Sequence, residues 1–184
     1  MLDMSVTARI FVIVDRELTD ISGADEALSF LNEAYRTRVT RAGRDAEHPI
    51  AVGRLLFEDG QPTRVVVVGL LHDVLEDTDA TAVELEDRFG ADVTRFVCAL
   101  TQDSSIAGYK KRKAALRRQI VEAGPEAATA SLADKLAKLR SGQSRPATRK
   151  LVHYRETLDA IEARYGSSRL SVQLREQLEH WPPR

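Results

Sequence analysis

This 184-residue sequence has one cysteine, no long apolar run and almost no excess of either charge. The single cysteine, Cys98, cannot form an internal disulfide, which favours a reducing compartment such as the cytoplasm. The apolar run at residues 10–14 is short and is closed by Asp15, so it predicts neither a signal peptide nor a membrane span. The 27 Lys and Arg residues nearly balance the 28 Asp and Glu residues, which argues against binding to nucleic acid or to a membrane surface. A soluble, cytoplasmic protein is expected.

The sequence does contain helical periodicity over most of its length. At 184 residues it is long enough for one domain with a buried core. Apolar residues recur at helical spacing, as at Ala27, Leu28, Leu31 and Ala34. Helices are predicted over residues 7–18 (where a strand is the alternative), 22–40, 49–58, 63–77, 81–89, 92–100, a basic segment that includes 110–118, 127–140, 148–165 and 170–179. The predicted fold class is therefore all-α, in a single domain, and nothing in the sequence indicates an oligomer.

The most informative segment is LLHDVLEDTD, at residues 70–79. It follows a solidly apolar run, which predicts one buried helix that continues to Asp77. Positions four apart share a helix face, so His72 is expected beside Glu76 and Asp73 beside Asp77. Buried carboxylates need a partner or a proton, and Mn²⁺, Fe²⁺ or Zn²⁺ suits a set of imidazole and carboxylate ligands. The alternative is one histidine satisfied in the core beside a solvated acidic turn.

Two further candidate metal ligands lie elsewhere in the chain. His48 precedes a proline at a predicted helix N-terminus. Asp134 lies at the edge of the apolar face of the predicted helix 127–140, next to small residues, where it can reach into a cavity. Each of the two is an ordinary surface residue when considered alone. Lys135 and Lys138 are expected further round the same helix, toward solvent.

Basic residues are dense in only one segment, residues 110–118. A charge run of this kind is usually a solvated helix face, and that is the interpretation for most of its members. Recruitment of a phosphate group is the alternative for Arg112 or Lys113.

These motifs occur in an order that resembles a known family. His48-Pro49, then His72-Asp73, then Asp134 within LADKL resemble the H…HD…D signature of the HD phosphohydrolase superfamily. The Glu76-Asp77 extension is closer still to the alarmone (ppGpp) hydrolase branch, which includes RelA/SpoT-type enzymes and small alarmone hydrolases. The resemblance implies an HD-type helical bundle with its core at 41–158, N-terminal helices at 1–40 packed on that core, and a C-terminal helical tail at 159–184.

The same resemblance implies a hydrolytic site. One Mn²⁺ would be held by four ligands, His48, His72, Asp73 and Asp134. Glu76 and Asp77 would orient or deprotonate a water molecule that attacks phosphorus. The implied reaction is removal of pyrophosphate from the 3′ position of a guanosine polyphosphate. Tyr154 resembles a family tyrosine near the nucleotide, and a tyrosine packed by its ring is the alternative.

Two segments depart from the family pattern near the nucleotide. The loop that begins at Arg41 lacks the Pro-Tyr that usually precedes the first histidine. After LADKL, Ala137-Lys138 replaces an aromatic residue or histidine followed by asparagine. Arg41 and Lys138 are therefore further candidates for substrate binding. Two alternative functions remain open: hydrolysis of another nucleotide or phosphomonoester, and a catalytically silent sensor in which a cation such as Lys138 traps phosphates.

Overall fold

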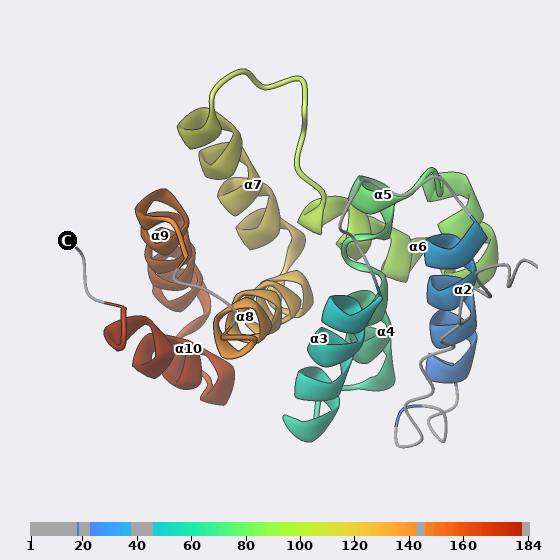
Figure 1. Ribbon diagram of the computed structural model, residues 1–184, viewed down its shortest axis with the longest axis horizontal. Helices are drawn as coiled ribbons and strands as arrows, with labels where there is room; N and C mark the ends of the chain where they lie inside the picture. The colour runs from blue at the N-terminus through green and yellow to red at the C-terminus, as the bar shows by residue number, and fades with distance from the viewer. Residues whose placement is uncertain (1–17, 19–22, 38–45, 143–145, 182–184) are drawn as a thin grey trace, which may run out of the picture.

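The computed structural model describes residues 18, 23–37, 46–142 and 146–181, and these form a helical bundle without strands (Figure 1). Its helices are α2 (Ala24–Thr37), α3 (Glu47–Glu58), α4 (Thr63–Leu71), α5 (Val74–Asp77), α6 (Ala82–Leu100), α7 (Tyr109–Ala123), α8 (Pro125–Arg140), α9 (Thr148–Tyr165) and α10 (Arg169–Glu179). The predicted all-α class is confirmed. The helix predicted at residues 7–18 lies almost entirely outside the described ranges. Among the described residues, no helix combines the length and apolarity that a membrane crossing requires.

Helix α8 is the central element of the bundle. It contacts α3 and α4 on one side and α9 and α10 on the other, and α7 packs against it as well (Figure 1). Because it is surrounded in this way, most of its residues are buried, including several outside its apolar stripe. Any side chain that α8 directs toward α3 and α4 therefore enters the interior.

Two glycines bring α3 and α4 close together. A Cβ added at Gly53 would lie 2.6 Å from Leu70 Cδ2, and one added at Gly69 would collide with Leu56 Cδ1. Interiors are packed densely, so larger side chains here would force the two helices apart. The close approach places the N-terminus of α3, with His48, beside the C-terminus of α4, with His72.

The predicted single helix 63–77 is wrong at its centre. α4 ends at Leu71 and α5 begins at Val74, and Asp73 between them has φ −100° and ψ −5°. These angles lie in the sparsely allowed bridge region, which is common at active sites. The chain re-enters helix when the Asp73 carbonyl accepts hydrogen bonds from the backbone N–H groups of Glu76 (3.0 Å) and Asp77 (2.9 Å).

The predicted boundary between 81–89 and 92–100 is confirmed as a kink within α6. Thr81 and Glu84 form a capping box at its start, in which the Glu84 carboxylate accepts the Thr81 backbone N–H at 2.8 Å. Gly90 then adopts φ 79°, a conformation that favours glycine. The second half of α6 ends at Leu100, which forms part of the wall of the candidate functional site.

Candidate metal centre and its pocket

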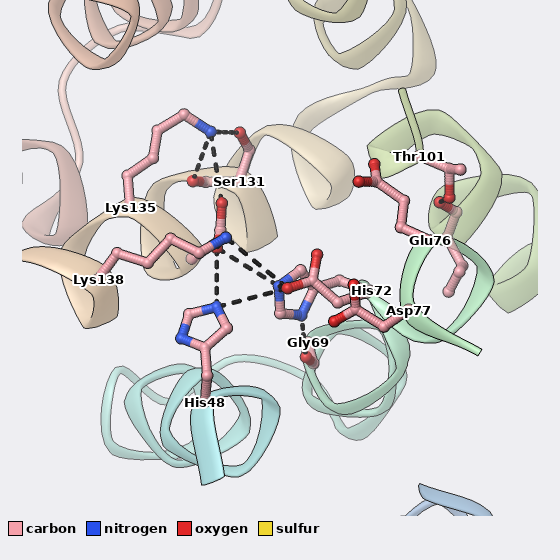
Figure 2. A network of polar contacts seen from close by, with 12 residues as sticks. His48, Gly69, His72, Glu76, Asp77, Thr101, Ser131, Lys135 and Lys138 are labelled. Carbon is pink, nitrogen blue, oxygen red and sulfur yellow. Dashed lines mark hydrogen bonds and ion pairs between the residues drawn. The ribbon is translucent and has the colours of Figure 1, made fainter. Parts of the chain in front are cut away.

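The structure brings the four predicted metal ligands together from two helices and one turn. His48 comes from α3, and His72 from the turn after α4 (Figure 2). Asp73 follows His72 in that turn, and Asp134 comes from α8. One ligand atom from each residue lies within 4.8 Å of all the others. Among the described residues this is the group whose geometry suits a metal ion. Two imidazoles and two carboxylates fit a borderline divalent cation such as Mn²⁺, Fe²⁺ or Zn²⁺.

His72 is oriented for metal binding by its other ring nitrogen. Its side chain is buried, and Nδ1 lies 2.7 Å from the carbonyl oxygen of Gly69, to which it donates a hydrogen bond. That bond leaves Nε2 directed at the carboxylates, and Nε2 is a buried atom without a hydrogen-bond partner. It lies 3.1 Å from Asp73 Oδ2 and 3.4 Å from Asp134 Oδ1. A ring nitrogen that faces two carboxylates favours a positive charge between them, either a proton or a metal ion, and a backbone carbonyl that fixes the ligand tautomer is typical of metal sites.

The pKa values of the four candidate ligands also indicate that the site favours a bound positive charge. Burial lowers the pKa of His72, but Asp73 and Asp134 outweigh burial and raise it to about 10. Burial alone would raise the pKa of Asp73 and that of Asp134, but neighbouring groups outweigh it and both pKa values are lowered. His72 and Lys138 lower the pKa of Asp73, and Lys138 and His48 lower that of Asp134. For His48 burial dominates and lowers the pKa. Both carboxylates are therefore ionised and able to serve as ligands.

The expectation that Lys135 and Lys138 face solvent is wrong. Lys138 Nζ lies 2.6 Å from Asp134 Oδ1 and 3.7 Å from Asp73 Oδ2, because residues four apart share a helix face. Lys135 is only 3% exposed, and its ammonium donates to Ser131 Oγ at 2.7 Å. Burial lowers its pKa to about 8. The helical projection of α8 alone could not foresee the burial of Lys135, since neighbouring helices cover the side that the projection assigns to solvent.

The two acidic residues of α5 have different surroundings. Glu76 lines the pocket, and its carboxylate accepts hydrogen bonds from the backbone N–H of Gln102 at 2.7 Å and from its side-chain Nε2 at 3.1 Å. Asp77 is 5% exposed, and its Oδ2 accepts a hydrogen bond from the hydroxyl of Tyr35 at 3.0 Å. Asp77 is therefore tied to α2, on a different side of α5 from the pocket. Nothing in the sequence indicated that Gln102 and Tyr35 would donate hydrogen bonds to these two carboxylates.

A cavity of about 250 Å³ opens beside the ligand cluster and is bounded by α7, α8 and α9. Four of the five predicted substrate-binding residues line it: Arg112, Lys113, Lys138 and Tyr154. The exposed members of the basic run, such as Lys110 and Lys111, form the solvated face that was predicted. Arg41 lies outside the described residues.

His153 is a pocket residue that had no predicted role. Its side chain is buried, with Nδ1 3.5 Å from Arg117 Nη1 and 3.3 Å from Thr157 Oγ1. Burial, followed by the nearby Lys135 and Lys113, lowers its pKa to about 3. A neutral imidazole with Nδ1 as acceptor carries its proton on Nε2, so it is a hydrogen-bond donor among cations.

Comparison with known proteins identifies the family. A family model described as HD domain matches residues 27–161, which include all four ligands. This chain belongs to the HD domain family. The HD resemblance predicted from the sequence is therefore confirmed, and the His72-Asp73 pair lies in the turn between α4 and α5.

Several named proteins are similar to this chain in sequence. A zebrafish (Danio rerio) guanosine-3′,5′-bis(diphosphate) 3′-pyrophosphohydrolase MESH1 is 46% identical over 127 residues, 62% of this chain and 66% of that protein. The human (Homo sapiens) MESH1 is 40% identical over 95 residues, 50% of this chain and 52% of the relative. The alignments thus span between half and two thirds of these relatives.

The fold is also similar to that of a solved structure. The structure of a metazoan ortholog of SpoT that hydrolyses ppGpp matches with a TM-score of 0.71 and 26% identity, over 85% of this chain and 94% of that one. The predicted HD-type helical bundle is confirmed by this likeness.

Proposed function

We propose that this chain is a metal-dependent phosphohydrolase that removes pyrophosphate from the 3′ position of guanosine-3′,5′-bis(diphosphate). The observation that carries the proposal is the convergence of His48, His72, Asp73 and Asp134 at one end of a cavity whose other wall is cationic. The relatives named for this activity, at 40–46% identity, support the choice of substrate.

The metal site is proposed to hold one Mn²⁺, with Fe²⁺ or Zn²⁺ as alternative ions of similar ligand preference. A divalent ion bound there would polarise phosphoryl oxygens and acidify a water molecule. His72, with its tautomer set by the Gly69 carbonyl, presents Nε2 as a ligand, while Asp73 and Asp134 supply the negative charge that such an ion needs.

We assign the proton-accepting role to Glu76 rather than to Asp77. Glu76 lines the cavity and its carboxylate is held by Gln102, which leaves it facing the substrate space. In the reaction a water oxygen forms a bond to phosphorus, the bond from phosphorus to the ribose 3′ oxygen breaks, and pyrophosphate leaves. Glu76 would accept the proton of the water, and the 3′ oxygen takes up a proton from solvent. Asp77, bonded to Tyr35, would position the α5 turn.

The remaining wall is proposed to bind the nucleotide. Arg112 and Lys113 on α7 and Lys138 on α8 offer positive charge to phosphates, and Tyr154 on α9 offers an aromatic face. Lys113 is half-buried, so a phosphate near it would be partly shielded from water. Arg41 is kept as a candidate from its sequence position alone.

The partner is proposed to be this small nucleotide and not a nucleic acid or a membrane, since the net charge of the chain is −1. The single cysteine supports a location in the cytoplasm.

The test is turnover by metal-stripped protein with added Mn²⁺, on ppGpp beside a panel of ordinary nucleotides and phosphomonoesters. Release of pyrophosphate from ppGpp is the expected result. Hydrolysis of another substrate with ppGpp untouched would replace the substrate and keep the metal site. Tight nucleotide binding without turnover under any metal would instead support a sensor.

A further inference from the structure

The ammonium group of Lys138 lies inside the ligand set of the metal centre. Its Nζ is 2.6 Å from Asp134 Oδ1 and 3.7 Å from Asp73 Oδ2. The same Asp134 Oδ1 faces both imidazoles, at 3.0 Å from His48 Nε2 and 3.4 Å from His72 Nε2. Asp73 Oδ2 also faces both imidazoles, at 3.7 Å from His48 Nε2 and 3.1 Å from His72 Nε2. The lysine thus lies near both carboxylate oxygens that the two histidine ligands face.

We propose that Lys138 is a built-in cation that competes with the divalent metal for Asp73 and Asp134 and thereby sets the metal affinity of the site. The inference rests on the metal site of the proposed function, but not on its substrate or its turnover. A metal ion and an ammonium at Asp134 Oδ1 repel each other, because both are cations and both would lie within a few ångströms of that oxygen. Displacement of the lysine therefore favours binding of the metal.

The contact follows from the helix and not from a chance side-chain position. Asp134 and Lys138 are separated by one turn of α8, in the order in which an acidic residue precedes a basic one, which is the favourable order on a helix. The neighbouring Lys135 contacts the other oxygen of the same carboxylate, Oδ2, at a longer distance of 3.7 Å and is anchored by Ser131. Only Lys138 reaches the oxygen that faces the histidines, among the described lysines.

The cavity beside the metal centre can accept the Lys138 side chain when the metal displaces it. Its side chain is 35% exposed and lines the cavity of about 250 Å³, whereas Lys135 is 3% exposed and enclosed. A long flexible stem lets the ammonium leave Asp134 without any movement of α8. If the displaced state is populated at about 1–10%, the apparent metal affinity is about 10- to 100-fold weaker than that of the same ligand set without the lysine.

The experiment is calorimetric titration of the metal-stripped full chain with Mn²⁺ alone, without nucleotide. Lys138→Met keeps most of the stem and removes the charge, and we expect it to bind Mn²⁺ at least about 10-fold more tightly than the wild type. Lys150→Met is the matched control, because Lys150 lines the same cavity from α9 but contacts neither carboxylate. Its Mn²⁺ affinity should stay within about threefold of the wild type, since exposed charges at a distance interact weakly.

Lys138→Arg separates charge from packing. It keeps a cation at the position, so its Mn²⁺ affinity should remain low, near that of the wild type. Equal or weaker Mn²⁺ binding by Lys138→Met, in protein shown by its cooperative thermal unfolding to be folded, would overturn the proposal. Lys138→Gln replaces Lys138→Met if the latter does not fold. Failure of every variant to bind Mn²⁺ or Zn²⁺ would overturn it too. Tighter metal binding without ppGpp turnover would uphold this inference and count against the proposed function alone.

Discussion

The two ends of the cavity are built on different principles. The metal end, defined as His48, His72, Asp73 and Asp134, places four ligand atoms within 4.8 Å of one another. The cationic wall, defined as Arg112, Lys113, Lys135, His153 and Tyr154, lines the space more loosely from three helices. A small ion requires its ligands at fixed short distances, whereas an extended anion is attracted by positive charge spread over a surface.

Burial has opposite consequences at the two ends. At the metal end, mutual attraction overcomes burial and raises the pKa of His72 to about 10. In the cationic wall, burial dominates: it outweighs the attraction of Asp134 and lowers the pKa of Lys135 to about 8, and with the nearby cations it lowers that of His153 to about 3. The metal end therefore favours bound cations, and the cationic wall favours bound anions. A phosphorylated ligand bridging a metal ion and the wall would satisfy both.

The largest effect is expected at the metal end. Asp134→Asn removes the carboxylate that contacts both histidines, so we expect Mn²⁺ binding and ppGpp turnover to fall to background. Calorimetric titration with Mn²⁺ measures metal binding, and release of pyrophosphate measures ppGpp turnover. Asp87→Asn, which changes an exposed aspartate on α6, is the control. Retained metal binding by Asp134→Asn would mean that the cluster is not the metal site.

Glu76→Gln should separate chemistry from metal binding. We expect kcat to fall by about 10²- to 10⁴-fold, the usual contribution of a general base, while the Mn²⁺ affinity stays unchanged. The amide keeps the size of the side chain and one acceptor for Gln102. A parallel loss of metal affinity would show that Glu76 belongs to the metal end, and unchanged kcat would remove it from the mechanism.

A change in the cationic wall should affect substrate binding alone. Lys113→Met is expected to raise KM for ppGpp at least about tenfold with kcat and Mn²⁺ affinity unchanged, because a charged hydrogen bond contributes about 1.5–3 kcal/mol. Lys110→Met, on the same helix but exposed and away from the cavity, is the matched control. If both variants behaved alike, the basic run would be a solvated face throughout.

The smallest effect concerns stability. The pKa of His153 is lowered from an ordinary value of 6.5 to about 3 in the folded chain. Between these two pH values the imidazole is protonated in the unfolded chain and neutral in the folded chain. Stability therefore falls as the pH drops from about 6.5 toward 3, by at most about 1.4 kcal/mol per pH unit from this group.

Urea unfolding of the wild type and of His153→Gln from pH 7 to pH 4 measures that contribution. The variant should lose less stability on acidification than the wild type. His180→Gln, which removes an exposed histidine, is the control. Identical pH slopes for wild type and His153→Gln would contradict the buried, neutral state assigned to His153.

The sequence by itself determined the helical class, most helix boundaries and the identity of the candidate ligands. Apolar periodicity and capping residues act over a few neighbouring positions, so α3, α6 and α9 could be predicted within a few residues. The ligands could be named because their types and order match a known pattern, although their convergence needed the fold.

Only the tertiary structure decided how the surrounding charges are arranged. It broke the predicted helix at His72-Asp73, buried Lys135, brought Asp73 to Lys138 and placed His153 in the cationic wall. The physical reason is that burial of a residue on α8 or α9 depends on which helices cover it. Those contacts join residues far apart in the chain, and no local pattern records them.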